Sequence, residues 1–179
     1  MQINSKKELL VYSYRVAGTV GLMMAKILNV KDKNSLKSAI DLGIAMQLTN
    51  ISRDIVEDSK NNRFYISHNF ESIKETLKTA DLFYESSFPS IKKIPFNFRF
   101  SILVARRVYR KIGQNILNKK TIENYNNSKK IYVTNIGKII QTFLSLYDLI
   151  RLSLIKDDDH LRYKEHQIIN EEINLNERL

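Results

Sequence analysis

The chain has 179 residues, which is long enough to bury one sizeable hydrophobic core. It contains no cysteine, which excludes a disulfide scaffold, a cysteine-ligated zinc site and a thiol nucleophile. The formal net charge of +10 favours a polyanionic partner such as nucleic acid, an anionic membrane surface or a diphosphate. A general bias toward lysine, asparagine and isoleucine would give the same charge, so both interpretations stay open.

The residue pattern predicts an all-α fold. Only five glycines and two prolines interrupt the chain, which favours long helices over a turn-rich β fold. Apolar residues recur at helical spacing in successive segments that polar breaks separate. The expected helices cover about residues 5–28, 35–60, 71–88, 96–118 and 134–155, with Asn34 as an N-cap and Pro89 as a helix stop. Residues 61–69 and 119–130 are expected to be loops.

The chain is expected to form one domain with a tail. Residues 1–156 make up the predicted helical domain, and the charged residues 157–179 are predicted to be frayed or weakly helical. No stretch approaches the roughly 18 apolar residues of a transmembrane helix. The first ten residues lack the apolar core and cleavage site of a signal peptide. We therefore expect a cytoplasmic protein.

A polar row in the expected helix 35–60 carries the most chemical information. At about 100° per residue, Gln47, Asn50, Asp54 and Asp58 fall on one helical face, because they are three, four and four residues apart. Two carboxylates and an amide oxygen in line are hard oxygen ligands, which Mg²⁺ prefers together with water and phosphate oxygens. Arg53 lies beside the row and has the planar fork that binds phosphate through two bonds.

The same row has a simpler interpretation. Two acidic residues one turn apart occur on many solvent-exposed helix faces. Here, however, the first half of the helix is apolar and closely packable, with Leu42, Gly43, Ala45 and Leu48. The row therefore continues a face suited to burial, where polar groups cost stability unless they bind something. From the residues alone, a metal–phosphate site and a solvated face both stay open.

Two ordered motifs connect the chain to a known family. The first runs from Tyr12 to Met24 and includes Tyr14, Val16, Ala17, Gly18 and Gly21. The second consists of Leu42, Gly43, Gln47, Asn50, Arg53, Asp54, Asp58, Arg63 and Tyr65. Both resemble the signature motifs of the squalene/phytoene synthase family, in the family's order and separation. Residues 80–84, 94–95 and 108–113 are similar to bacterial phytoene synthases, so the resemblance covers about residues 8–150.

The resemblance implies a fold and an activity. The fold is the all-helical isoprenoid (terpenoid) synthase fold, here without its N-terminal helices. The activity is that of a prenyltransferase in carotenoid biosynthesis, which joins two geranylgeranyl diphosphates head to head. Mg²⁺, or Mn²⁺ in its place, would assist the loss of diphosphate by neutralising the leaving group. The motifs do not separate this product from that of a squalene- or hydroxysqualene-type synthase.

The resemblance also implies roles for individual residues. The implied metal ligands are Asn50, Asp54 and Asp58, and the implied catalytic residues are Arg53, Asp54 and Asp58. The residues implied to hold the diphosphate are Gln47, Arg53, Tyr109 and Lys130, with Lys129 as the alternative to Lys130. The residues implied to line the cavity beside the reacting carbons are Tyr12, Val16, Gly18 and Tyr65.

One expected motif is absent from the sequence. The family carries another Asp-x-x-x-Asp motif upstream, whereas Asp54 and Asp58 are the only pair at this spacing here. Half of the expected metal cluster is therefore not encoded, and an N-terminal companion chain is one way to supply it. The rival hypothesis is a non-catalytic protein that keeps the fold for assembly. Nucleic-acid binding would rest on charge alone and is not expected.

Two further groups of residues have simple interpretations. Arg106, Arg107, Arg110 and Lys111 form a basic cluster, which is most simply a solvated helix face. Its alternatives are contact with diphosphate or, at a peripheral membrane site, with anionic lipid. The histidines, which are His68, His160 and His166, are scattered among polar neighbours, so we expect no metal or base role for them.

Overall fold

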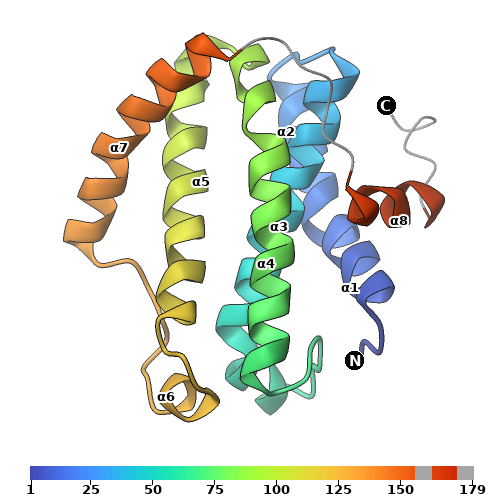
Figure 1. The fold of residues 1–179 in the computed structure, drawn as a ribbon. Helices are drawn as coiled ribbons and strands as arrows, with labels where there is room; N and C mark the ends of the chain where they lie inside the picture. The colour runs from blue at the N-terminus through green and yellow to red at the C-terminus, as the bar shows by residue number, and fades with distance from the viewer. Residues whose placement is uncertain (156–162, 173–179) are drawn as a thin grey trace.

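The computed structural model describes residues 1–155 and 163–172, and these are arranged as packed helices (Figure 1). The helices are α1 (Lys6–Ser13), α2 (Thr19–Ile27), α3 (Lys33–Lys60), α4 (Phe70–Ser87), α5 (Phe96–Leu117), α6 (Ile122–Asn126), α7 (Asn135–Leu154) and α8 (Lys164–Glu172). A π-helical turn η1 (Tyr14–Gly18) joins α1 to α2, and a 3₁₀ turn η2 (Pro89–Lys93) joins α4 to α5. The described residues contain no strand beyond an isolated bridge between Gln2 and Phe64. The all-α prediction is confirmed.

Polar side chains mark the beginnings of the helices. The Asp32 carboxylate accepts a hydrogen bond from the Ser35 amide, so the predicted N-cap Asn34 was two residues too late. The Asn69 side chain caps α4 in the same way, and Thr134 caps α7. As predicted, α4 ends before Pro89, which instead begins the 3₁₀ turn.

Helix α3 is the centre of the bundle. In Figure 1 it runs behind α4, with α2 beside it, while α5 and then α7 lie on the opposite side from α1 and α8. Its buried side chains include Ile40, Ile44 and Leu48, which pack in one core with Tyr14 and Phe83. The helix on which the polar row was predicted is therefore held from several sides at once.

Two glycines bring α2 and η1 into close contact with α3. A Cβ atom on Gly43 would lie 2.2 Å from the carbonyl oxygen of Ala17, and one on Gly21 would lie 2.1 Å from that of Ala39. No larger side chain fits at either position without moving a backbone. The closeness of these elements explains why small residues recur in both sequence motifs.

The predicted tail contains a helix that packs on the bundle. In α8, His166 and Ile169 are buried, and Glu165 pairs with Lys6 of α1 at 2.7 Å. The His166 Nε2 atom lies 3.0 Å from Oδ2 of the buried Asp41 in α3. Residues 156–162 and 173–179 lie outside the described residues, as does His160, so the predicted boundary at residue 156 stays a prediction.

Within the described part of the chain, none of the helices combines the length and apolar character that crossing a bilayer requires.

Candidate active site

The polar row of α3 begins where the floor of an apolar cavity ends. This cavity has a volume of about 500 Å³ and is lined by small and apolar side chains from η1, α2, α3, η2 and α5. Leu42 and Met46 of α3 form part of its floor, and Asn50 follows Met46 by one helical turn. Gln47, Asn50, Asp54 and Asp58 are all partly buried, which fits a position at the lip of a cavity better than a fully solvated face.

The side-chain oxygen of Asn50 is left without a hydrogen-bond partner. This Oδ1 atom is buried and is one of two side-chain polar atoms in this state among the described residues. Burying an unsatisfied carbonyl oxygen costs free energy, on the order of 1–3 kcal/mol. An orphaned hard oxygen beside two carboxylates is what a site for a divalent cation would leave in the free protein.

Asp54 is paired with two cations. The Arg53 guanidinium donates to both carboxylate oxygens, with Nε 2.9 Å from Oδ1 and Nη2 2.6 Å from Oδ2, and Lys130 Nζ lies 3.3 Å from Oδ1. Burial alone raises the pKa of Asp54, but the bonds from Arg53 and Lys130 outweigh it, so the pKa is lowered. Asp54 is therefore ionised at neutral pH.

Asp58 has the opposite electrostatic environment. Its pKa is raised, first because burial disfavours the charge and second because the Asp54 carboxylate lies one turn away. Arg63 and Lys130 offset only part of this effect. A cation placed between the two acids would relieve this unfavourable ionisation.

Tyr12 and Tyr65 meet across the two motifs. The Tyr12 hydroxyl donates to the Tyr65 hydroxyl at 3.0 Å, and their rings stack with centroids 4.9 Å apart. Burial and this hydrogen bond raise the pKa of Tyr65 to about 12. Asp58 contributes to the same shift, which puts the tyrosine pair within electrostatic range of the row.

The remaining predicted residues differ in where they lie. Val16 lines the cavity, and Tyr109 of α5 lies within electrostatic range of Arg53. The backbone of Gly18 faces the core instead, because a Cβ atom there would lie 3.0 Å from side chains of Ile40 and Tyr14. Lys130 reaches the row, whereas Lys129 makes no ion pair with it in the described structure.

Two residues beside the row were missed in the sequence analysis. Glu57 of α3 accepts a bond from Lys130 at 2.5 Å and so holds that lysine beside Asp54. The hydroxyl of the buried Tyr125 donates to the carbonyl oxygens of Arg53 at 2.7 Å and Ser52 at 3.0 Å. The signal for Tyr125 was a lone aromatic residue in the polar segment 119–130, which was predicted to be a loop and contains α6.

The basic cluster of α5 binds internal partners. Arg107 pairs with the buried Asp148 of α7, with Nη2 2.7 Å from Oδ1, and Arg110 pairs with Asp81 at 2.6 Å. Arg106 donates twice to the Tyr84 carbonyl, and burial lowers the pKa of Arg106 to about 10. These three side chains therefore join α5 to α4 and α7, which corrects the solvated-face interpretation.

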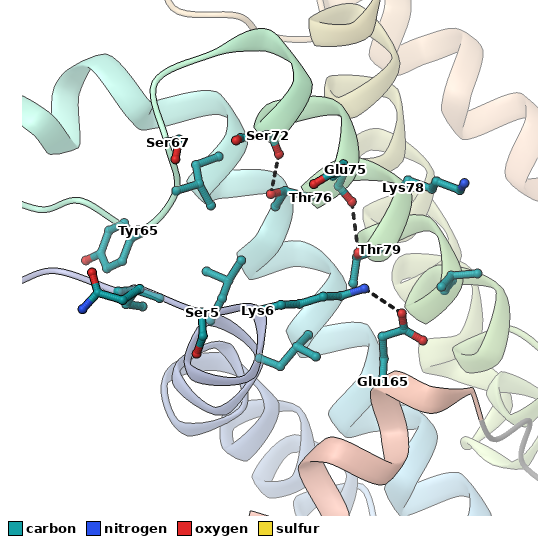
Figure 2. Close-up of a pocket in the computed structure, with 16 residues that line it drawn as sticks. Ser5, Lys6, Tyr65, Ser67, Ser72, Glu75, Thr76, Lys78, Thr79 and Glu165 are labelled. Atoms are coloured by element: carbon teal, nitrogen blue, oxygen red, sulfur yellow. Dashed lines mark hydrogen bonds and ion pairs between the residues drawn. The ribbon is translucent and has the colours of Figure 1, made fainter.

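A cavity of about 600 Å³ lies apart from the row, between α1, α4 and α8 (Figure 2). Lys6 extends across it to Glu165, and the Thr76 and Thr79 hydroxyls donate to carbonyl oxygens of their own helix. Of the predicted site residues only Tyr65 lines it. The Lys6 and Glu165 charges neutralise each other there, and both threonine hydroxyls bond within α4.

The described residues contain no complete metal-binding group. No group of three or more histidine, cysteine or acidic side chains in residues 1–155 and 163–172 is arranged to bind a metal ion. Asn50, Asp54 and Asp58 lie on one face of α3, and Mg²⁺ sites commonly use one or two carboxylates together with water and phosphate oxygens.

Comparison with known proteins finds similarity to one family. The model of the squalene/phytoene synthase family matches residues 1–70, which include both motifs. The 15-cis-phytoene synthase of Enterobacter agglomerans is 37% identical over 127 residues, which cover 59% of this chain and 43% of that protein. Over these residues the chain is similar to the squalene/phytoene synthase family.

The similarity to this family extends to plants and to a known structure. Phytoene synthase 1 of Arabidopsis thaliana, a chloroplastic protein, is 30% identical over 162 residues, which are 74% of this chain and 37% of that protein. A crystal structure of a dehydrosqualene synthase in complex with ligand superposes with a TM-score of 0.70 and 24% identity, over 84% of this chain and 60% of that one. The isoprenoid synthase fold is thereby confirmed. The chain spans about two fifths of the length of the curated squalene/phytoene synthases that it matches.

Proposed function

We propose that this chain supplies one half of the active site of a phytoene synthase-type prenyltransferase. The reaction would join two geranylgeranyl diphosphates head to head, with loss of both diphosphates. The observation that carries this proposal is that one helix, α3, provides both the floor of an apolar cavity and, one turn further, the orphaned Asn50 oxygen with Asp54 and Asp58. An allylic diphosphate needs these two environments side by side.

Each part of the site has a chemical task. Asn50, Asp54 and Asp58 would hold Mg²⁺ or Mn²⁺, which supplies positive charge to the departing diphosphate. Gln47, Arg53, Tyr109 and Lys130 would bind the diphosphate oxygens, and Arg53 has the fork that fits two of them. The cavity beside Val16 would hold the isoprenoid chain and keep water from the carbocation. Tyr12 and Tyr65 are not among its lining residues and are joined to each other through their hydroxyls.

The other half of the site would come from an N-terminal companion. Helix α2 exposes a row of apolar side chains that includes Met23 and Met24, the latter 52% exposed, beside the open cavity. Helix α7 exposes an apolar stripe, namely Ile136, Ile139, Ile140, Phe143, Leu146, Tyr147 and Ile150. Exposed apolar surface of this extent marks an interaction site. We propose that both faces pack against a helical portion that carries the first Asp-x-x-x-Asp motif.

The apolar stripe of α7 also suits a second, weaker role. A cytoplasmic enzyme with apolar substrate and product gains from contact with a membrane surface. Tyr147 and Phe143 of the stripe are large apolar side chains that are 62% and 68% exposed. Sedimentation with anionic vesicles, with and without the companion, would test peripheral contact, because a stripe covered by the companion cannot also reach lipid.

The test of the proposed function is complementation. The purified chain is assayed for turnover of geranylgeranyl diphosphate with Mg²⁺, first alone and then mixed with the N-terminal portion of a bacterial phytoene synthase. Turnover only on mixing supports a half-site completed by a companion. Robust turnover by the chain alone contradicts the half-site. Tight association without turnover would favour the rival role, a fold-retaining assembly protein.

A further inference from the structure

Asp54 is the acid of the row whose carboxylate is already neutralised. Arg53 grips both of its oxygens, at 2.9 and 2.6 Å, and Lys130 adds a third contact at 3.3 Å. The Arg53 and Asp54 side chains are only 16% and 18% exposed, so solvent screens this pair incompletely. A guanidinium fork on a carboxylate is among the strongest ion pairs in proteins. In the free protein, the first of the two acids in the row is therefore paired with neighbouring side chains of the chain itself.

Lys130 is held in this arrangement by the fold. Its ammonium contacts Glu57 Oε2 at 2.5 Å, one turn along α3 from Arg53. The segment that carries Lys130 is anchored on both sides of this residue. Before it, the Tyr125 hydroxyl donates to the Arg53 carbonyl oxygen, and after it, the Ile131 side chain is buried. A surface lysine fixed between two such anchors loses much of its side-chain freedom on folding. Its position beside Asp54 is thus a built feature of α6 and the segment after it.

These contacts oppose a metal ion that arrives by itself. A divalent cation must displace the Arg53 fork from Asp54 and then sit close to two positive charges, and both steps are electrostatically unfavourable. A diphosphate has the opposite effect, because its oxygens can accept the same guanidinium fork and the same ammonium. When Arg53 and Lys130 turn to a phosphate, the Asp54 carboxylate becomes available to the metal.

We infer that Arg53 and Lys130 are built-in counter-ions that transfer from Asp54 to an incoming diphosphate, so that metal and diphosphate bind to this face together. This inference rests on the proposed function, since it assigns the order of binding at the same site. Because coupling between two ligands is reciprocal, the metal must strengthen diphosphate binding by the same factor by which diphosphate strengthens metal binding. That factor is expected to be at least about tenfold, within the usual range for coupled sites.

The inference is tested by binding experiments on the full 179-residue chain. Binding of Mn²⁺ alone is measured from the electron paramagnetic resonance signal of the free ion. Binding of pyrophosphate alone, and of the Mn²⁺–pyrophosphate complex, is measured by calorimetry. The variants are Arg53→Gln and Lys130→Gln, with Lys129→Gln as the matched control that removes an adjacent lysine charge. Circular dichroism checks that each variant is folded.

The two ligands should respond to the variants in opposite directions. Arg53→Gln and Lys130→Gln should tighten binding of Mn²⁺ alone by several-fold and weaken binding of the Mn²⁺–pyrophosphate complex by about tenfold or more. Lys129→Gln should change neither by more than about twofold. If Mn²⁺ binds more weakly or equally well in both variants, the counter-ion role is overturned while the site itself stands. If the unmodified chain binds neither ligand at millimolar concentration, the inference is overturned, whereas the proposed half-site is decided by the complementation assay.

Discussion

Acidic side chains have opposite environments in two regions of helix α3. Near its beginning, Asp41 is 3% exposed and accepts hydrogen bonds from Ser86 of α4, at 2.5 Å, and from His166 of α8. The Tyr163 amide donates to His166 Nδ1 at 2.8 Å, so the ring proton lies on Nε2 and points to Asp41. This acid is closed in by elements that are far apart in the sequence.

Further along α3, the polar row is left incomplete by the fold. The Asn50 oxygen has no partner, and the pKa of Asp58 is raised by burial and by the charge of Asp54. The contrast teaches how to distinguish structural from functional polar groups on one helix. Asp41 is matched within the chain and stabilises it, whereas the Asn50 oxygen and the Asp58 charge are left unmatched, which favours a ligand site beside them.

The largest expected effect concerns catalysis by the row. In the complemented, active form, Asp54→Asn should lower turnover at least about a hundredfold, because a neutral amide gives the metal no charge compensation. The melting temperature should fall only modestly, because the variant loses the ion pairs with Arg53 and Lys130 but no part of the packed core. Turnover is measured with geranylgeranyl diphosphate and Mg²⁺. Normal turnover together with a large loss of stability would contradict this prediction. It would show that Asp54, like Asp41, serves the stability of the fold.

The corresponding substitution near the beginning of α3, at Asp41, should lower the stability of the fold. Asp41→Asn should lower the free energy of unfolding by about 2 kcal/mol, because one buried donor of Ser86 or His166 loses its charged acceptor. Urea unfolding of the whole chain measures this change. In an Asp41→Asn, His166→Gln double variant the two losses should be less than additive, since both remove the same contact. Full additivity would show that the contact between α3 and α8 contributes little.

The Tyr125 hydroxyl tests whether the contact between α6 and α3 stabilises the fold. Tyr125→Phe should lower the free energy of unfolding by about 1 kcal/mol, the usual value of one hydrogen bond. Burial raises the pKa of Tyr125 to about 12, from 10.0 in the unfolded chain. This contribution is therefore present below pH 10 and is lost as the pH rises toward 12. The difference between Tyr125→Phe and the unmodified chain should shrink over that interval, and a constant difference would contradict the role of the hydroxyl.

The smallest effect is an expected gain in stability. Asp58→Asn should raise the free energy of unfolding at pH 7 by a few tenths of a kcal/mol, because it removes one of two like charges one turn apart. The pKa of Asp58 is raised in the folded chain, so its ionisation destabilises the fold above the ordinary value of 3.8. The gain should vanish below that pH, where Asp58 is protonated in both states. A loss of stability at pH 7 would show instead that Asp58, like Asp41, stabilises the fold.

Local patterns were sufficient for the helices and for the row. Helical periodicity, Pro89 and polar breaks predicted the long helices, because each depends on residues within a few turns of one another. The spacing of Asn50, Asp54 and Asp58 predicted a shared face for the same reason. The two family motifs predicted the family and its fold, since they are long and ordered.

Only the tertiary structure decided which polar groups have partners. His166 lies 125 residues from Asp41, and Arg107 lies 41 residues from Asp148, so no local pattern could pair them. The choice of Lys130 over Lys129 depends on how Tyr125 anchors its segment to α3. A hydrogen bond or ion pair between distant residues exists only once packing brings them together, and the same packing leaves the oxygen of Asn50 without a partner.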